Sequence, residues 1–181
     1  RSGTSMLMQM LEAGGVRILT DRVRAADEDN PKGYFEFEAV KRLIQDQSCL
    51  PAAHGMAVKI VAPLVCSLPR GARYRVLLLE RDHDEVLDSQ TKMMARRGES
   101  PGSSPERRAR LREEFARIME RTKKMLRSRG DVELMVMQYR EVVRDPARAA
   151  ARIDGFAGGT LDTEGMAAAV DRTLHRNRRQ N

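Results

Sequence analysis

With 181 residues the chain is long enough for one domain with a substantial core, and its 33 Lys and Arg against 26 Asp and Glu give a formal net charge of +7. This charge indicates an anionic partner such as a nucleotide, a nucleic acid or a membrane surface, while an aromatic content of 4% without tryptophan disfavours the base-stacking surfaces of single-strand binders. The two cysteines are isolated and the three histidines are scattered, which argues against a disulfide framework or a metal cluster and favours a cytoplasmic protein.

A short polar loop opens the chain and leads into an apolar stretch. The loop runs from Arg1 to Ser5, and the apolar side chains of residues 6–11 recur at helical spacing until Gly14-Gly15, which predicts the end of a helix. A glycine lets the backbone approach phosphate oxygens, and the N–H groups of a helix's first turn point at the same place. The pattern therefore predicts an anion-binding loop at a helix N-terminus.

This loop departs from the phosphate loop of nucleotide kinases at one position. In register with the pattern G-x-x-x-x-G-K-[ST], Gly3 and Ser5 hold the last glycine and the hydroxyl, but Thr4 replaces the lysine. The cation precedes the glycine instead, as Arg1. Small polar residues before a helix are also ordinary N-caps, so the loop alone leaves both interpretations open. Because the chain begins inside this loop without an initiator Met, we expect it to be a fragment that lacks the preceding strand.

Turn-forming residues fill the segment from Asp27 to Gly33. After them, Tyr34 to Ile44 predicts a second helix, with Glu36 and Glu38 in its first turn. The expected buried set of this helix is Phe35, Val40, Leu43 and Ile44.

Three apolar runs predict strands. These are residues 57–61, Tyr74 to Glu80, and Glu133 to Tyr139, and the continuous apolar centre of the second is typical of a strand buried on both faces. Helical patterns lie between and after the runs, which predicts an α/β fold with a central parallel sheet flanked by helices. No apolar run approaches the roughly 18 residues of a membrane span.

The region between the second and third runs predicts a long helix. Ser104 is suited to an N-cap with Pro105 at the first helical position. The expected core stripe of this helix is Leu111, Phe115, Ile118, Met119 and Leu126. Its basic face is interpreted as a solvated surface rather than a binding patch. The polar segment 96–103 before it is the best candidate for a mobile lid.

Arg81 and Ser89 form the second informative pattern. Arg81 follows the central strand, at the edge of the sheet where open α/β sheets bind ligands. Ser89 lies eight residues later in the next helix, so the two side chains could hold one phosphate from two sides. The alternative is a surface arginine paired with Asp82 or Asp84.

Together these residues resemble the sulfotransferases that use 3′-phosphoadenosine 5′-phosphosulfate. The loop P-[KR]-S-G-T-[ST] of that family is matched from Arg1 through Ser5, and its arginine followed eight residues later by serine is matched by Arg81 and Ser89. Residues 139–146 resemble a third signature of the family, a strand that ends in tyrosine with an acid and a proline soon after. Residues 30–36 look like bacterial members. The resemblance spans roughly residues 1 to 160 and implies a single sulfotransferase-like domain with a P-loop NTPase-like three-layer fold.

The resemblance also implies which residues bind the nucleotide donor. The loop would hold the 5′-phosphosulfate, Arg81 and Ser89 the 3′-phosphate, and Tyr139 would lie beside the adenine. The loop residues in question are Arg1, Ser2, Gly3, Thr4 and Ser5. No metal is implied.

The catalytic base departs from the cytosolic members of the family. They carry K-T-H before the arginine strand with histidine as the base, whereas here Lys59 is kept and Val61 takes the histidine position. In some bacterial relatives a glutamate after the first helix plays this part, and Glu36 is the matching residue. Glu38 and Asp27 remain alternatives for the base. Three arginines near the C-terminus are further candidates for the 3′-phosphate: Arg172, Arg176 and Arg178.

The function expected from this resemblance is in-line transfer of a sulfuryl group to a hydroxyl or amine acceptor. Arg1 and the loop amides would hold the sulfate and 5′-phosphate oxygens, Lys59 would offset the charge on the leaving phosphate, and Glu36 would orient and deprotonate the acceptor. One rival is a P-loop kinase, which needs Mg²⁺ and a phosphate-reaching lysine that Thr4 replaces. Another is a non-catalytic nucleotide- or nucleic-acid-binding module. The sequence identifies neither the acceptor nor the oligomeric state.

Overall fold

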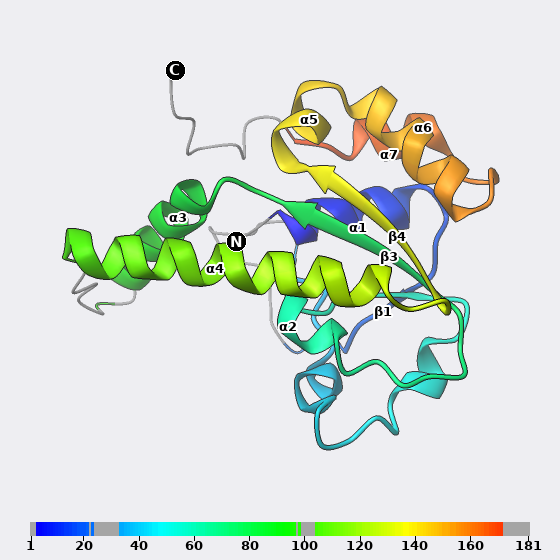
Figure 1. The fold of residues 1–181 in the computed structure, drawn as a ribbon. Coiled ribbons are helices and arrows are strands. Elements are labelled where there is room, and N and C mark those ends of the chain that lie inside the picture. The colour runs from blue at the N-terminus through cyan, green and yellow to red at the C-terminus, as the bar shows by residue number, and fades with distance from the viewer. Residues whose placement is uncertain (1–2, 22, 24–32, 97, 99–103, 172–181) are drawn as a thin grey trace.

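Two long strands lie side by side and run parallel (Figure 1). The computed structural model describes residues 3–21, 23, 33–96, 98 and 104–171. Within them, β1 (Ile18–Leu19) pairs with β2 (Ala57–Val58), and β3 (Tyr74–Glu80) pairs with β4 (Val132–Gln138). The fold is therefore mixed α/β and mostly helical, and the described residues hold two small parallel sheets rather than one central sheet.

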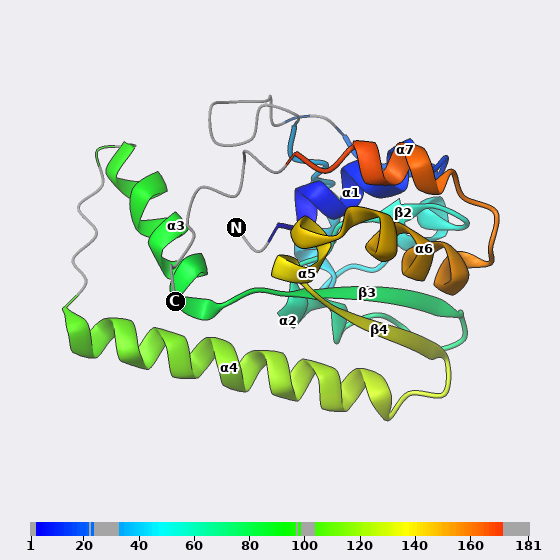
Figure 2. The same ribbon diagram turned by 90° about the horizontal axis from the view of Figure 1, so that it is seen from above.

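Helices cover both faces of the β3–β4 pair (Figure 2). Leu79 and Met137 pack with α1 (Thr4–Ala13) in the larger core. Val76 and Leu134, which belong to the same two strands, point to the other face, where they pack against Leu126 of α4 (Pro105–Arg127). Side chains alternate between the faces of a strand, so apolar residues at successive positions place a strand between two helical layers.

The remaining elements lie before β3 and after β4. Before β3 come η1 (Glu38–Arg42), η2 (Leu50–Ala53) and α2 (Ala62–Val65). The crossover from β3 to β4 consists of α3 (His83–Arg96) and α4. After β4 come α5 (Tyr139–Arg144), α6 (Pro146–Ala157) and α7 (Thr163–Ala168), and α5 to α7 lie on the same side of the sheet as α1 (Figure 2).

Several sequence predictions are confirmed. The first helix ends at Gly14, as the glycine pair predicted. β3 has the predicted bounds, although only Leu78 and Leu79 of its residues are buried and the others are partly buried or exposed. The Ser104 hydroxyl accepts a hydrogen bond from the Arg107 amide, which makes it the N-cap of α4.

The predicted helix over Tyr34 to Ile44 is wrong in most of its length. The chain is irregular up to Phe37, and only the short 3₁₀ helix η1 follows. The reason is tertiary: the Glu36 carbonyl accepts from the Asp21 amide, and an Asp21 carboxylate oxygen accepts from the Glu38 amide. These bonds occupy backbone groups that a helix would need, so Glu36 lies before the 3₁₀ turn. Of the predicted buried set, Val40 and Leu43 are buried and Ile44 is 67% exposed.

Two further predictions need adjustment. The run 57–61 is a strand only at Ala57 and Val58, because Pro63 already lies in the first turn of α2. The predicted lid lies mostly outside the described residues. Within the part of the chain that the structure describes, no helix is long and apolar enough to cross a membrane.

Candidate functional site

Gly3 caps the N-terminus of α1 in a conformation that favours glycine. Its φ is 90°, and its carbonyl accepts from the amides of Met6 at 3.0 Å and Leu7 at 3.3 Å. A glycine has no side chain that could accept hydrogen bonds from the first-turn amides. The start of α1 is thus built from backbone, with Thr4 and Ser5 as its first two residues. Arg1 and Ser2 lie outside the described residues.

Tyr139 packs directly against this glycine. A Cβ at Gly3 would lie 2.3 Å from Cδ2 of Tyr139, closer than real contacts allow. Tyr139 follows the last residue of β4 and is 5% exposed. The loop before α1 is therefore held against the carboxyl end of the β3–β4 pair, and any side chain at Gly3 would separate them.

Arg81 contacts the same tyrosine. Its Cζ lies 4.4 Å from the centroid of the Tyr139 ring, within cation–π range. Burial raises the pKa of the Tyr139 phenol, and the opposing charge of Arg81 is a smaller influence, so the phenol is neutral at physiological pH. Gly3, Tyr139 and Arg81 consequently form one continuous contact at the ends of two parallel strands.

Glu85 is the ion-pair partner of Arg81. Nε of Arg81 donates to a Glu85 carboxylate oxygen at 3.0 Å, and the carboxylate is fully buried. The two acids considered from sequence have other roles: Asp82 accepts from the Glu85 amide at 3.1 Å, and Asp84 pairs with Arg108 of α4. Arg81 is therefore anchored from within α3.

Arg140 donates to the same carboxylate. Its Nε and Nη2 lie 3.0 and 2.6 Å from Oε1 of Glu85, while Arg81 binds Oε2. Burial alone would raise the pKa of Glu85, but the hydrogen bonds and charges of Arg140 and Arg81 outweigh it and hold that pKa below its ordinary value. Glu85 is thus an ionised carboxylate between two guanidinium groups.

Ser89 lies one turn after Glu85 on α3 and is 9% exposed. Four-residue spacing puts it on the same helix face as Glu85, facing the interior. Its placement relative to the Arg81 ion pair therefore rests on the helix face that it shares with Glu85.

Lys59 joins the start of α1 to Glu36. Its Nζ lies 3.4 Å from Oγ of Ser5 and 3.9 Å from Oε1 of Glu36, and it donates to the Tyr34 carbonyl. The Lys59 side chain is 14% exposed and that of Glu36 is 21% exposed. A shielded ammonium therefore sits between the hydroxyl of the loop and a carboxylate.

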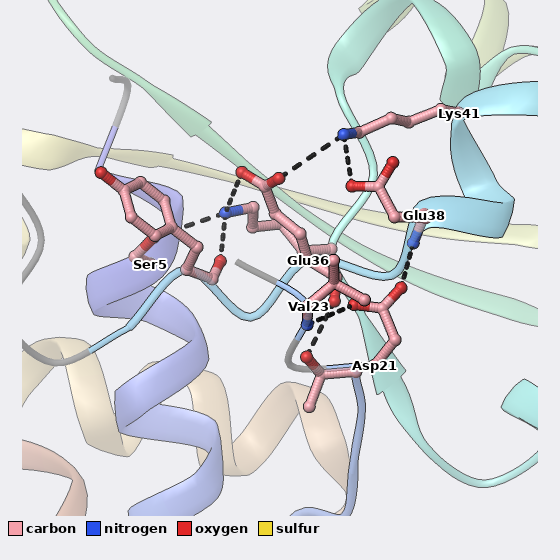
Figure 3. Close-up of polar contacts among 9 residues, drawn as sticks. Ser5, Asp21, Val23, Glu36, Glu38 and Lys41 are labelled. Carbon is pink, nitrogen blue, oxygen red and sulfur yellow. Dashed lines mark hydrogen bonds and ion pairs between the residues drawn. The ribbon is translucent and has the colours of Figure 1, made fainter. Parts of the chain in front are cut away.

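The alternative bases have different surroundings. Glu36 contacts Lys41 at 3.6 Å as well as Lys59, whereas the more exposed Glu38 is paired with Lys41 at 2.5 Å (Figure 3). The neighbouring Asp21, which is not one of the candidate bases, accepts from the amides of Glu38 and Val23, and these backbone hydrogen bonds lower its pKa. Glu36 is consequently the carboxylate beside Lys59 and the loop, and Asp27 lies outside the described residues.

The predicted site residues fall into two adjoining groups. Gly3, Arg81 and Tyr139 form one, Ser5, Lys59 and Glu36 form the other, and α1 begins between them. The C-terminal candidates Arg172, Arg176 and Arg178 lie outside the described residues. Sequence reasoning missed Glu85 and Arg140, although the four-residue spacing from Arg81 to Glu85 is a standard helical ion-pair signal.

Neither a search for metal-binding side chains nor a comparison with known proteins adds to the description of this site. Within the described ranges, no group of three or more His, Cys, Asp or Glu side chains is placed to hold a metal ion. Comparison with protein-family models, curated proteins and solved structures finds no significant match.

Proposed function

We propose that the chain is a sulfotransferase domain that uses 3′-phosphoadenosine 5′-phosphosulfate. The observation that carries the proposal is the contact of Tyr139 with both Gly3 and Arg81, because it joins three motif positions that are far apart in the sequence. A sequence coincidence would not require these positions to meet. Their meeting supports one ligand that is bound at the loop and at Arg81 together.

The proposed donor is bound from two ends. Residues 1–5 and the first-turn amides of α1 hold the 5′-phosphosulfate, Arg81 and Ser89 hold the 3′-phosphate, and Tyr139 lies by the adenine. The β3–β4 pair with helices on both faces supports the finer proposal of a P-loop NTPase-like three-layer fold.

The proposed reaction is an in-line transfer without a metal. A bond forms between the acceptor oxygen and sulfur while the bond from sulfur to the 5′-phosphate oxygen breaks, and the acceptor proton passes to Glu36. Lys59, with Arg1, offsets the charge that grows on the leaving phosphate. Lys59 and Glu36 form an ion pair with 3.9 Å between Nζ and Oε1, and this proximity supports the division of roles.

A second candidate function rests on helix α4. It contains nine Lys and Arg against four Asp and Glu, a net of +5 against +7 for the whole chain. Such a helix favours a non-catalytic module that binds nucleic acid through charge. A P-loop kinase remains the other rival, with Thr4 in place of its lysine as the argument against it.

Thermal denaturation with three nucleotides separates these functions. The sulfotransferase predicts strong stabilisation by adenosine 3′,5′-bisphosphate and weak stabilisation by 5′-AMP. Equal stabilisation by both nucleotides would contradict the proposed 3′-phosphate site. A preference for Mg-ATP would favour the kinase, and nucleic-acid binding that falls steeply with salt, without any bisphosphate preference, would favour the basic module.

A further inference from the structure

Two arginines at the carboxyl ends of neighbouring strands share one buried carboxylate. Arg81 follows β3, Arg140 lies one residue beyond the first residue of α5, and each binds a different oxygen of Glu85. The pairing of Arg140 with Glu85 spans 55 residues of sequence. It therefore depends on the parallel register of β3 and β4.

This arrangement carries two energetic costs. Arg81 and Arg140 lie at the starts of α3 and α5, and a helix N-terminus disfavours cations by a few tenths of a kcal/mol or more. Burying the Glu85 carboxylate carries a further desolvation cost of several kcal/mol. Among the residues that the structure describes, two guanidinium groups share this single buried carboxylate, whereas the nearby Asp82 is exposed to solvent.

Arg140 presents its guanidinium group to solvent. Its side chain is 46% exposed, in contrast to 8% for Arg81. Its hydrogen bonds to Glu85 use Nε and Nη2, which leaves the Nη1 edge without a partner in the part of the chain that the structure describes. The negative charge of Asp82 also acts on Arg140, but Asp82 is exposed to solvent, which screens this charge, and its carboxylate accepts from the Glu85 amide.

We propose that Arg140 is a second anion-binding residue of this site and that Glu85 is the positioning residue that holds Arg81 and Arg140 as a pair. The ligand is the 3′-phosphate of the nucleotide, so this inference rests on the proposed function. A phosphate monoester carries close to two negative charges at neutral pH. It matches two guanidinium groups that are already oriented better than it matches one.

The test of Arg140 is calorimetric binding of adenosine 3′,5′-bisphosphate and of 5′-AMP. Arg140→Gln lowers bisphosphate affinity about ten- to a hundredfold, the worth of a charged hydrogen bond, and leaves 5′-AMP affinity unchanged. Arg140→Lys, which keeps the charge but not the fork, loses less. Arg152→Gln is the matched control, since it removes a half-exposed arginine that pairs with Glu141 of the same helix α5.

The test of Glu85 uses the ratio of the two affinities, which a general loss of stability does not change. Glu85→Gln lowers the preference for bisphosphate over 5′-AMP, and Glu85→Asp restores part of it. If the wild-type protein prefers bisphosphate and Arg140→Gln keeps the full preference, the inference fails and the proposed function stands. If the wild-type protein shows no preference, both are overturned.

Discussion

The guanidinium carbon of Arg81 lies 4.4 Å from the centre of the Tyr139 ring, and the edge of that ring closes on the backbone of Gly3. Each residue stands where an element begins or ends: Gly3 before α1, Arg81 after β3 and Tyr139 after β4. The contact makes the position of the loop dependent on the ends of the strands. Several predictions about nucleotide binding and stability rest on this dependence.

Gly3→Ala should damage the loop more than a change at another glycine of the same conformation. Gly3 and Gly15 both have a φ of 90°, which costs an alanine roughly 1–2 kcal/mol. At Gly15 a Cβ meets nothing within 4 Å, but at Gly3 it meets the Tyr139 ring. We expect Gly3→Ala to lower the free energy of unfolding more than Gly15→Ala and to abolish bisphosphate binding. An equal decrease in the free energy of unfolding in the two variants would show that the Tyr139 contact does not contribute to stability.

Glu36→Gln should abolish sulfuryl transfer while leaving bisphosphate affinity nearly intact. The amide keeps the shape of the side chain beside Lys59 but removes the base. The measurement is transfer of labelled sulfate to an acceptor found by screening. Glu38→Gln is the control, because Glu38 pairs with Lys41 whereas Glu36 pairs with Lys59. Normal turnover of Glu36→Gln would move the base to another residue.

Lys59→Met should lower the affinities for adenosine 3′,5′-bisphosphate and for 5′-AMP by a similar factor. Lys59 lies beside Ser5, at the end of the site that receives the 5′-phosphate, and both adenosine 3′,5′-bisphosphate and 5′-AMP carry that group. Lys41→Met is the control, since it removes the other ammonium group near Glu36 from a 56% exposed position. A loss confined to the bisphosphate would contradict the orientation assigned to the donor.

Acid should remove the stability contributed by Glu85. Because the pKa of Glu85 is lowered in the folded protein, its contribution is complete above the unfolded value of about 4.3 and disappears as pH falls through the folded value. Urea unfolding from pH 7 to pH 3 should show Glu85→Gln less stable at pH 7 and less sensitive to acid. Glu133→Gln, which removes a 60% exposed carboxylate, is the control. An unchanged gap between wild type and Glu85→Gln at every pH would contradict this account.

Arg129→Met should destabilise the fold without changing nucleotide preference. Arg129 is 6% exposed, donates to the carbonyls of Leu68 and Pro69, and pairs with Asp131 at 2.6 Å. Removing it leaves these acceptors without their donor, at a cost of about 3 kcal/mol. Arg127→Met, on the exposed side of α4, should cost less than about 0.5 kcal/mol. Chemical denaturation measures both, and a loss of bisphosphate preference in Arg129→Met would remove the distinction between structural and ligand-binding arginines.

The sequence was informative where one local signal decided the structure. The continuous apolar run from Tyr74 to Glu80 predicted β3, and Ser104 with Pro105 predicted the start of α4. The segment from Tyr34 to Ile44 has helical spacing, but hydrogen bonds to Thr20 and Asp21 hold its first part away from helix. Such bonds join residues 16 and 17 positions apart, so no local pattern contains them.

The same distinction applies to the site. Gly3, Arg81 and Tyr139 belong to motifs that can be found separately, and the fold brings them together. Arg140 could not be assigned from its neighbours, because its partner Glu85 is brought to it by the register of β3 against β4. The sequence thus predicts the motif positions, whereas the charge balance around Arg81 emerges from the tertiary structure.

The most direct test of the central claim is a crystal structure of the chain with adenosine 3′,5′-bisphosphate. The account predicts the 5′-phosphate at the first-turn amides of α1, the 3′-phosphate within about 3 Å of the Arg81 guanidinium, and the adenine beside Tyr139. A nucleotide bound in the opposite direction, or seated on the basic face of α4 away from Tyr139, would contradict it.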